Sequence, residues 1–378
     1  MSLLRTAAIV ALVGCAAPDA EDSFTRVSGT VATSGAEAGL LFADFIDEAQ
    51  HSLSVALPSL EDEVIADALV QALDRGVEVE VVTDIDQLAD PGTETLQAAG
   101  VPLRLVDDGL GFFDFSLGRD VAWSSSQVRM SHAFAVADET EILSASTAGA
   151  LGEGARVVFS ASSEDLGDDL LMEFNQLMGG SDATAMTAYS ALAKSVADSR
   201  WRYPTSDGSV LEMWLGPQER LTKHVIDAVY SARSSIWILT NEFANDGLAT
   251  ALQTKASDGF EVKVVVGPDF KTTSLLQSKV LQNETPGVSK RKVDVATVPT
   301  IVLIDYDLAR NNRRYTARAM VLSHDLYSSS RVYRAEEVIS DWYIDGNLWI
   351  LNDDQAPSGF MQTLAGVFEE HFEQGGSL

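Results

Sequence analysis

Histidine transfers protons readily near neutral pH, and this chain of 378 residues has five histidines and one cysteine. Two histidines stand in apolar, strand-like segments: His132 lies within Met130–Asp138, and His324 is followed by Asp325. These two are the candidates for general acid or base chemistry. The other three fall on ends or faces of expected helices without a ligand-like neighbour: His51, His224 and His371. Because the sequence has no cluster of histidines, cysteines and carboxylates, we expect neither a metal site nor a cofactor.

Motifs of several other catalytic classes are missing from the sequence. Gly149, Gly152 and Gly154 surround no serine with the Gly-x-Ser-x-Gly spacing of a hydrolase nucleophile. There is no phosphate loop that ends in Lys-Ser or Lys-Thr, and no Gly-x-Gly-x-x-Gly after a strand. The sequence therefore does not predict a serine hydrolase, a P-loop enzyme or a dinucleotide-binding domain.

An internal repeat supplies the elements that must position the candidate residues. Glu48–Asp84 aligns without a gap with Ser231–Gly267, at an offset of 183 residues (231 − 48). Each copy predicts a strand, an amphipathic helix, a glycine and a second strand: Ser52–Leu57, Asp62–Leu73, Gly76 and Val77–Thr83, then Ser235–Thr240, Asp246–Ala256, Gly259 and Phe260–Val266. The short spacing between strand, helix and strand indicates two parallel strands joined by a right-handed crossover. We therefore expect a pseudo-twofold α/β molecule with its site between the copies.

Shorter patterns complete each copy. The first copy adds strands and a helix at 133–138, 141–146, 155–160 and 169–178. The second copy closes with an amphipathic helix near Phe360–Glu373. The expected boundaries are 34–181 for the first repeat, 182–208 for a connector and 209–378 for the second repeat.

The ordered motifs resemble those of the phospholipase D superfamily. In the first copy, Asp74–Val82 resembles the strand motif A-x-R-G-V-x-V-R-V, and Met130–Asp138 resembles M-H-x-K-F-x-V-x-D. Leu143–Ala148 is similar to the G-S-x-N strand, and Glu173–Gly180 is similar to the helix E-F-x-x-x-W-x-G. The matching pieces of the second copy are Pro299–Asp305, Leu322–Leu326 and the final helix. The resemblance implies an α/β fold in which two phospholipase D-like repeats form a pseudo-twofold mixed-sheet sandwich flanked by helices.

The same resemblance implies that the family's active site has been lost. The motif H-x-K-x4-D uses one histidine to attack phosphorus, the other to protonate the leaving oxygen, and the lysines to neutralise the phosphoryl oxygens. Aligned on the last aspartate of each motif, the vestigial positions are Ser131, Ala133 and Asp138 in the first copy and Val298, Thr300 and Asp305 in the second. Serine and valine cannot replace the histidines, and alanine and threonine bring no charge. Each surviving aspartate is either a site residue or a turn residue that ends its strand.

Two neighbouring histidines are candidate replacements. His132 is one residue late in the motif, so its ring should point away from the old site unless a β-bulge intervenes. His324 lies in the second G-S-x-N-like stretch, where Asp325 takes the place of asparagine, and it should approach the cleft between the repeats. For both, the alternative is a structural histidine satisfied by hydrogen bonds or solvent.

The first residues predict a lipid anchor. A positive charge at Arg5 precedes an apolar run too short to span a bilayer, and Leu12–Cys15 follows. Leu-Val-Gly-Cys resembles the lipobox of bacterial lipoproteins, so we expect a signal peptide at 1–15 and a lipid on Cys15; a chance cysteine beside an ordinary secretory signal is the alternative. Residues 16–33 are expected to form an acidic, flexible tether. The expected location is the bacterial cell envelope, on a membrane.

Two classes of function remain open. The first is an envelope-anchored, non-catalytic lipoprotein that binds a phosphate-bearing ligand, a glycan or a protein partner through the inter-repeat cleft or its surface. The second is a divergent phosphodiesterase or phosphatidyltransferase with relocated acid–base residues, for which His324 is the best candidate. Losing both histidines and both lysines removes covalent catalysis and charge stabilisation together, which favours the first class. The net charge of −30 argues against nucleic acid as a partner.

Overall fold

The fold is described by a computed structural model. The described residues are 25–106, 112–114, 119–121, 129–178, 202–206, 208–216, 219–268, 270, 277–282, 285–306, 317–326, 344–352 and 359–378. Cys15, with the rest of the leader, and connector residues 182–201 lie outside them. Every vestigial motif position and both candidate histidines lie inside them.

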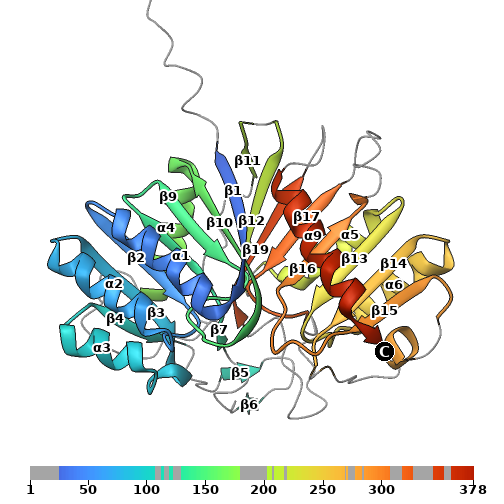
Figure 1. Ribbon diagram of the computed structural model, residues 1–378, viewed down its shortest axis with the longest axis horizontal. Helices are drawn as coiled ribbons and strands as arrows, with labels where there is room; N and C mark the ends of the chain where they lie inside the picture. Colours follow the sequence, from blue (N-terminus) through green and yellow to red (C-terminus); the bar gives the residue numbers. More distant parts are fainter. Residues whose placement is uncertain are drawn as a thin grey trace, which may run out of the picture.

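The first repeat builds a seven-stranded mixed sheet, in the order β1-β10-β9-β8-β2-β3-β4 (Figure 1). Its strands are β1 Arg26–Ser34, β2 Ser52–Leu57, β3 Glu78–Asp84, β4 Leu103–Val106, β8 Phe134–Ala137, β9 Glu141–Ala145 and β10 Glu153–Ser162. Its helices are α1 Gly35–Glu48, α2 Glu63–Asp74, α3 Pro91–Ala99 and α4 Glu164–Met178. β2 and β3 pair in parallel, while β8 runs antiparallel to both β2 and β9.

The second repeat builds a nine-stranded sheet, in the order β11-β12-β19-β17-β16-β13-β14-β15-β20. Its strands are β11 Arg202–Pro204, β12 Val210–Leu215, β13 Ser235–Thr240, β14 Glu261–Val266, β15 Val288–Lys292, β16 Thr300–Ile304, β17 Arg318–Leu322, β19 Asn347–Asn352 and β20 Gly376–Ser377. Its helices are α5 Leu221–Ser231, α6 Asp246–Ser257 and α9 Gly359–Gln374. Short pairs of strands lie outside both sheets: β5 Phe112–Asp114 with β6 Arg119–Val121, and β7 Arg129–Met130 with β18 Ile344–Asp345.

The repeated unit predicted from the sequence is confirmed in both copies. β2-α2-β3 and β13-α6-β14 are each a pair of parallel strands joined through a helix. An oxygen of Asp62 caps α2 by accepting from the Val64 N–H at 3.1 Å, and Asn245 caps α6 in the same way. Gly76 and Gly259 follow the helices with φ of 88° and 87°, a left-handed conformation that only glycine adopts without strain.

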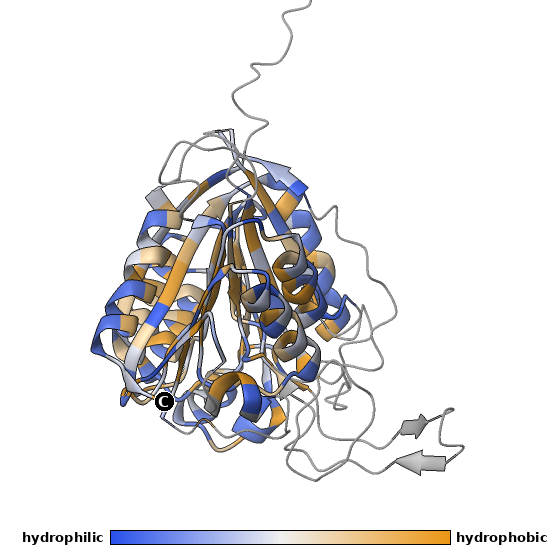
Figure 2. Cartoon of the chain, turned by 90° about the vertical axis from the view of Figure 1, so that its right-hand side faces the viewer, coloured by the Kyte–Doolittle hydropathy of each residue, from blue (hydrophilic) through white to orange (hydrophobic). Residues whose placement is uncertain are grey.

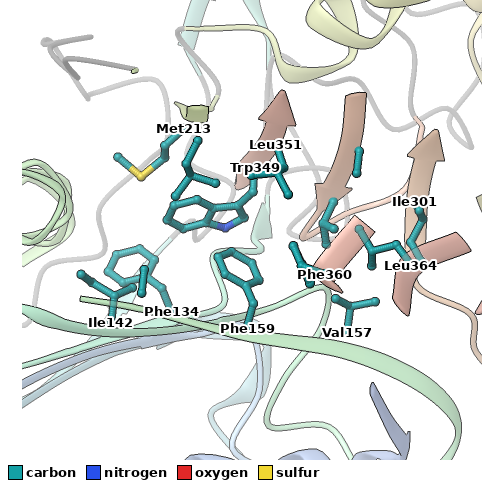
Figure 3. Packing of buried hydrophobic residues seen from close by; sticks show 14 of the residues in the cluster. Phe134, Ile142, Val157, Phe159, Met213, Ile301, Trp349, Leu351, Phe360 and Leu364 are labelled. Atoms are coloured by element: carbon teal, nitrogen blue, oxygen red, sulfur yellow. The ribbon is translucent and has the colours of Figure 1, made fainter. Parts of the chain in front are cut away.

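The two sheets face each other across a shared core, with helices on their outer faces (Figure 1). Helices α1 and α2 pack on the outer face of the first sheet, and α5 and α6 on that of the second. Side chains of both sheets and of α4 and α9 form the central cluster, in which Phe159, Trp349 and Phe360 are neighbours (Figure 3). Figure 2 shows the hydrophobic residues along the strands and hydrophilic residues on the outward side of the helices. The predicted sandwich of two repeats is confirmed.

The predicted tether is wrong for its second half. Residues 26–33, predicted to belong to a flexible segment, form most of β1, which pairs with β10 from Arg26 to Ser34. Side chains of Val27 and Val31 pack against the central cluster, so these residues bury apolar surface that a tether would leave in water. The folded body therefore begins by Thr25, whose N–H donates to the Pro204 carbonyl at 2.9 Å.

Candidate functional site

The surviving aspartate of the first motif ties two strands together. The carboxylate of Asp138 accepts backbone N–H groups at the start of β2, at 2.7 to 3.3 Å: Gln50, His51 and Ser52. Its own N–H donates to the Ser52 carbonyl at 3.0 Å. Burial alone would raise the pKa of the Asp138 carboxyl, but the three N–H donors together outweigh it and hold the pKa below its ordinary value.

Asp305 makes the same arrangement in the second repeat. Its carboxylate accepts three backbone N–H groups at 2.7 to 3.3 Å: Arg233, Ser234 and Ser235. Its φ is 53° and that of Asp138 is 50°, so each ends its strand in a left-handed turn conformation. Of the two roles left open by the sequence, these contacts fit that of the turn residue.

The lysine position of the first motif is closed by the second repeat. Ala133 is completely buried, and its N–H donates to the side-chain oxygen of Asn347 on β19 at 3.1 Å. The hydroxyl of Ser144 donates to the Ala133 carbonyl at 2.8 Å and accepts from the indole N–H of Trp349 at 3.0 Å. Both backbone groups of Ala133 are thereby held in a network that spans the two repeats.

The second motif is also part of a closed network. Val298 is 1% exposed within the central cluster, and its N–H and carbonyl both bond the side chain of Asn241 at 2.8 Å. The hydroxyl of Thr300 donates to an oxygen of Asp325 at 3.0 Å. The same oxygen accepts from the Thr240 hydroxyl and the Asn241 N–H at 2.9 and 3.0 Å. Asp325 therefore joins β13 to β16, which is a structural role.

His132 lies in the interior with an acidic partner. Its side chain is 0% exposed, and Nε2 lies 2.9 Å from Oε1 of Glu173 on α4, itself 3% exposed. Its ring meets that of Phe134 edge to face at 5.5 Å. Glu173 belongs to the closing helix motif of the first copy, but that motif does not predict its pairing with His132. The half-buried Ser131 precedes His132 and carries neither a ring nor a charge.

His324 is held against its own backbone turn. Nδ1 lies 2.7 Å from the carbonyl oxygen of Asp325, and the residue is 8% exposed. Gly346 packs on the ring, because a Cβ there would lie 2.7 Å from the His324 Cδ2 atom. Each candidate histidine thus contacts a group within its own repeat: His132 contacts the Glu173 carboxylate, and His324 contacts the Asp325 carbonyl.

Within the described part of the chain, no group of three or more histidine, cysteine and acidic side chains could hold a metal ion. No helix among the described residues is long and apolar enough to cross a membrane.

A cavity of about 440 Å³ opens at the seam of the repeats, in the size range of small-molecule sites. Its lining comes from β1, the end of the connector, β19 and α9: Val27, Ser28, Gly29, Thr205, Ser206, Ser209, Leu351, Gly359, Phe360 and Thr363. Five of these residues carry hydroxyls, one carries an aromatic ring, and none carries a charge. No sequence pattern predicts this cavity, since its walls come from segments more than 300 residues apart.

The comparisons with known proteins agree with this fold. Residues 42–140 match the family described as cardiolipin synthase, PLD-like domain. The structure of a phosphatidylserine synthase from Haemophilus influenzae Rd KW20 superposes with a TM-score of 0.61 at 11% identity, over 93% of this chain and 87% of that one. A polyphosphate kinase from Porphyromonas gingivalis gives 0.51 at 10% identity, over 86% of this chain and 47% of the kinase, so this chain spans about half of it. No curated protein matches at the level of sequence.

The chain is thus an α/β protein of two mixed sheets flanked by helices. Its first repeat is similar to the PLD-like domain over residues 42–140, as the motifs indicated, and its fold resembles that of the phosphatidylserine synthase over 93% of the chain. At 10 and 11% identity, the solved structures establish the fold and not the activity.

Proposed function

We propose that this chain is a non-catalytic phospholipase D-like protein that keeps the two-repeat scaffold for binding. One hydrogen bond carries the proposal, the 3.1 Å contact from the Ala133 N–H to Asn347 across the repeats. The Ala133 side chain packs in the cluster beneath α1 and α2, where a lysine ammonium would lose its hydration at a cost of several kcal/mol. The position that should neutralise a phosphoryl oxygen is therefore part of the structural core.

The second repeat supports the same conclusion. Val298 fills the central cluster where a nucleophile or proton donor is needed, and the Thr300 hydroxyl is bonded to Asp325. Valine and threonine differ from histidine and lysine in charge and in size. The covalent catalysis by histidine and the charge stabilisation by lysine are therefore lost entirely. His132 is 0% exposed, so its ring does not meet solvent in this structure.

The cavity at the seam supports a neutral ligand with hydroxyl groups, such as a glycan, over a phosphate-bearing one. Among the described residues its lining offers hydroxyl groups and the ring of Phe360, and no lysine or arginine to pair with an anion. Saturation-transfer NMR with neutral oligosaccharides and phosphorus NMR line broadening with inorganic phosphate distinguish the two ligand classes. Signals from phosphate alone, or sugar signals unchanged by Ser206→Trp in the cavity wall, would remove this assignment.

Turnover of bis(p-nitrophenyl) phosphate and of labelled phospholipid vesicles tests the absence of catalysis. We expect none above the blank. His132→Ala and His324→Ala serve as controls, because contaminating activity would survive both. Turnover that disappears with His324→Ala would replace this proposal by a phosphodiesterase with a rebuilt site.

We further propose that the protein is held at the bacterial envelope by a lipid on Cys15. The support is Leu12–Cys15, which resembles a lipobox, after a short apolar run. Residues 16–24 then remain as the link between the lipid and β1, since Arg26 already belongs to the sheet. Cys15→Ser should move the protein from the membrane fraction to the soluble fraction, and unchanged fractionation of that variant would refute the anchor.

A further inference from the structure

Three large hydrophobic side chains of the first repeat are exposed on or beside two neighbouring helices, α1 and α2. Leu40 on α1 is 55% exposed, Val64 on α2 is 43% exposed, and Leu151 in the loop before β10 is 44% exposed. Single exposed apolar residues are normal, whereas neighbouring ones mark interaction surfaces. These three side chains form an interaction surface only if they are neighbours.

Two sets of contacts place α1 and α2 side by side. Near their starts, a Cβ on Gly39 would lie 1.8 Å from an oxygen of Asp62, the cap of α2. Near their ends, Arg75 donates to the Ile46 carbonyl at 2.9 Å and to the Asp47 carboxylate at 3.2 Å. The helices therefore run in the same direction with their edges in contact.

Helical spacing brings Leu40 and Val64 to those edges. Leu40 precedes Asp47 by seven residues, so both lie on one stripe of α1. Val64 precedes Arg75 by eleven residues, which again places both on one stripe of the same helix. Because Asp47 and Arg75 bond each other, the two stripes face one another, and Leu40 and Val64 flank the line of contact between the helices, which is called the α1–α2 groove.

Leu151 closes the end of that groove. Its N–H donates to the Glu61 carboxylate at 2.9 Å, directly before the cap of α2. Its Cα lies 3.1 Å from where a Cβ of Gly35 would stand, at the first residue of α1. Leu151 thus contacts the N-terminal ends of both helices, beside the other two side chains.

The borders of the groove are strongly acidic. Residues 35–74 contain no lysine and no arginine. Exposed acidic side chains stand on both helices and the turn before α2: Glu37, Asp44, Glu61, Glu63 and Asp67. Such a surface repels anionic lipid and nucleic acid and attracts a cationic partner.

We propose that this α1–α2 groove docks a cationic amphipathic helix of a partner protein. The apolar face of that helix would cover Leu40, Val64 and Leu151, as amphipathic helices do in other grooves between helices. Its lysines and arginines would face the acidic borders, so that binding weakens as salt rises. This surface lies on the solvent-exposed side of α1 and α2, and the proposal is independent of whether the chain is catalytic.

The test uses the full chain and a synthetic amphipathic peptide of about 18 residues made of leucine and lysine, long enough for five helical turns. Binding is measured by fluorescence anisotropy at low and high salt. Leu40→Ser and Val64→Ser should each raise the Kd about tenfold, the loss expected for one buried apolar contact. A peptide with glutamate in place of lysine should not bind.

Tyr230→Ser is the matched control, because Tyr230 is 48% exposed on α5 of the second repeat and should leave the Kd unchanged. Circular dichroism and Tm of the variants verify that these surface changes leave the fold intact. Absence of binding, equal loss with Tyr230→Ser, or equal binding of the glutamate peptide would overturn the proposal. A dimer in sedimentation velocity that Leu40→Ser dissolves would also overturn it, by assigning the groove to a second copy.

Discussion

Asn347 of the second repeat accepts the backbone N–H of Ala133 in the first repeat, at 3.1 Å and out of contact with water. The bond joins residues 214 positions apart, at the strand that carries the vestigial motif. Beside it, Ser144 receives the indole N–H of Trp349 and the amide of Asn347 at 3.0 and 3.4 Å. This network stabilises the contact between the repeats at the place where the sequence analysis expected a cleft.

Asn347→Leu should destabilise the protein by about 1–3 kcal/mol, because it leaves the buried N–H of Ala133 without an acceptor. Chemical denaturation followed by tryptophan fluorescence gives the free energy of unfolding. Asn352→Leu, which removes a bond to Glu212 near the surface, is the control and should cost well under half as much. Equal losses of unfolding free energy in the two variants would show that the Ala133 contact stabilises the protein no more than the bond near the surface does.

The two motif aspartates should differ in how much they stabilise. Asp305 is 0% exposed, so Asp305→Asn, which removes the charge that accepts three N–H groups, should cost about 2–3 kcal/mol. Asp138 is partly exposed and screened by water, and Asp138→Asn should cost about 1 kcal/mol. Thermal unfolding of both variants at pH 7 measures the order. A larger loss for Asp138→Asn would contradict the roles assigned from burial.

Acid titration should separate Asp138 from its variant. The folded pKa of Asp138 lies below the ordinary 3.8, so its stabilisation is complete above that pH and is lost as the pH falls through the folded pKa. The difference in unfolding free energy between wild type and Asp138→Asn should therefore be constant above about pH 5 and shrink toward zero in stronger acid. A difference that grows on acidification would show the opposite direction of the pKa shift.

Sequence patterns were sufficient for the repeated units. β2 and β13 begin and end where the apolar runs Ser52–Leu57 and Ser235–Thr240 do, because a buried parallel strand is a continuous apolar run. β1 was missed because its residues are small and polar, and it pairs with β10, more than 100 positions away. Its alternation of Val27, Gly29 and Val31 was the available signal.

The site depended on contacts that no local pattern encodes. That positions 131 and 298 lack histidine follows from an alignment of residue types alone. That Asn347 and Trp349 would close the first motif could not be predicted, because β19 lies between β12 and β17 only in the folded sheet. Glu173 was likewise recognised as part of a helix motif and not as the partner of His132.

The His132–Glu173 pair should show strong coupling. His132→Ala removes the imidazole that lies 2.9 Å from the buried Glu173 carboxylate and should cost about 1–3 kcal/mol. Glu173→Gln removes the charge, so adding His132→Ala to it should cost much less than the single change does alone. A double-mutant cycle from urea unfolding gives the coupling energy. Additive losses would mean that the 2.9 Å contact contributes nothing beyond packing.

Asp325 distinguishes a structural network from a relocated catalytic site. Asp325→Ala leaves Thr240, Thr300 and the Asn241 N–H without their shared acceptor and should cost about 2–3 kcal/mol. Asp325→Asn keeps an oxygen for the same donors and should cost less than about 1 kcal/mol.

If Asp325 instead served His324 in acid–base catalysis, loss of its charge would matter more than loss of its hydrogen bonds. Asp325→Asn would then abolish turnover while leaving the fold intact, and Asp325→Ala would reduce turnover to the same extent. Parallel measurements of the Tm and of phosphodiester turnover in the two variants separate these cases. We expect Asp325→Ala to lower the Tm more than Asp325→Asn does, and neither variant to show turnover above the blank. The reason is that the Asp325 oxygen already accepts hydrogen bonds from β13 and β16.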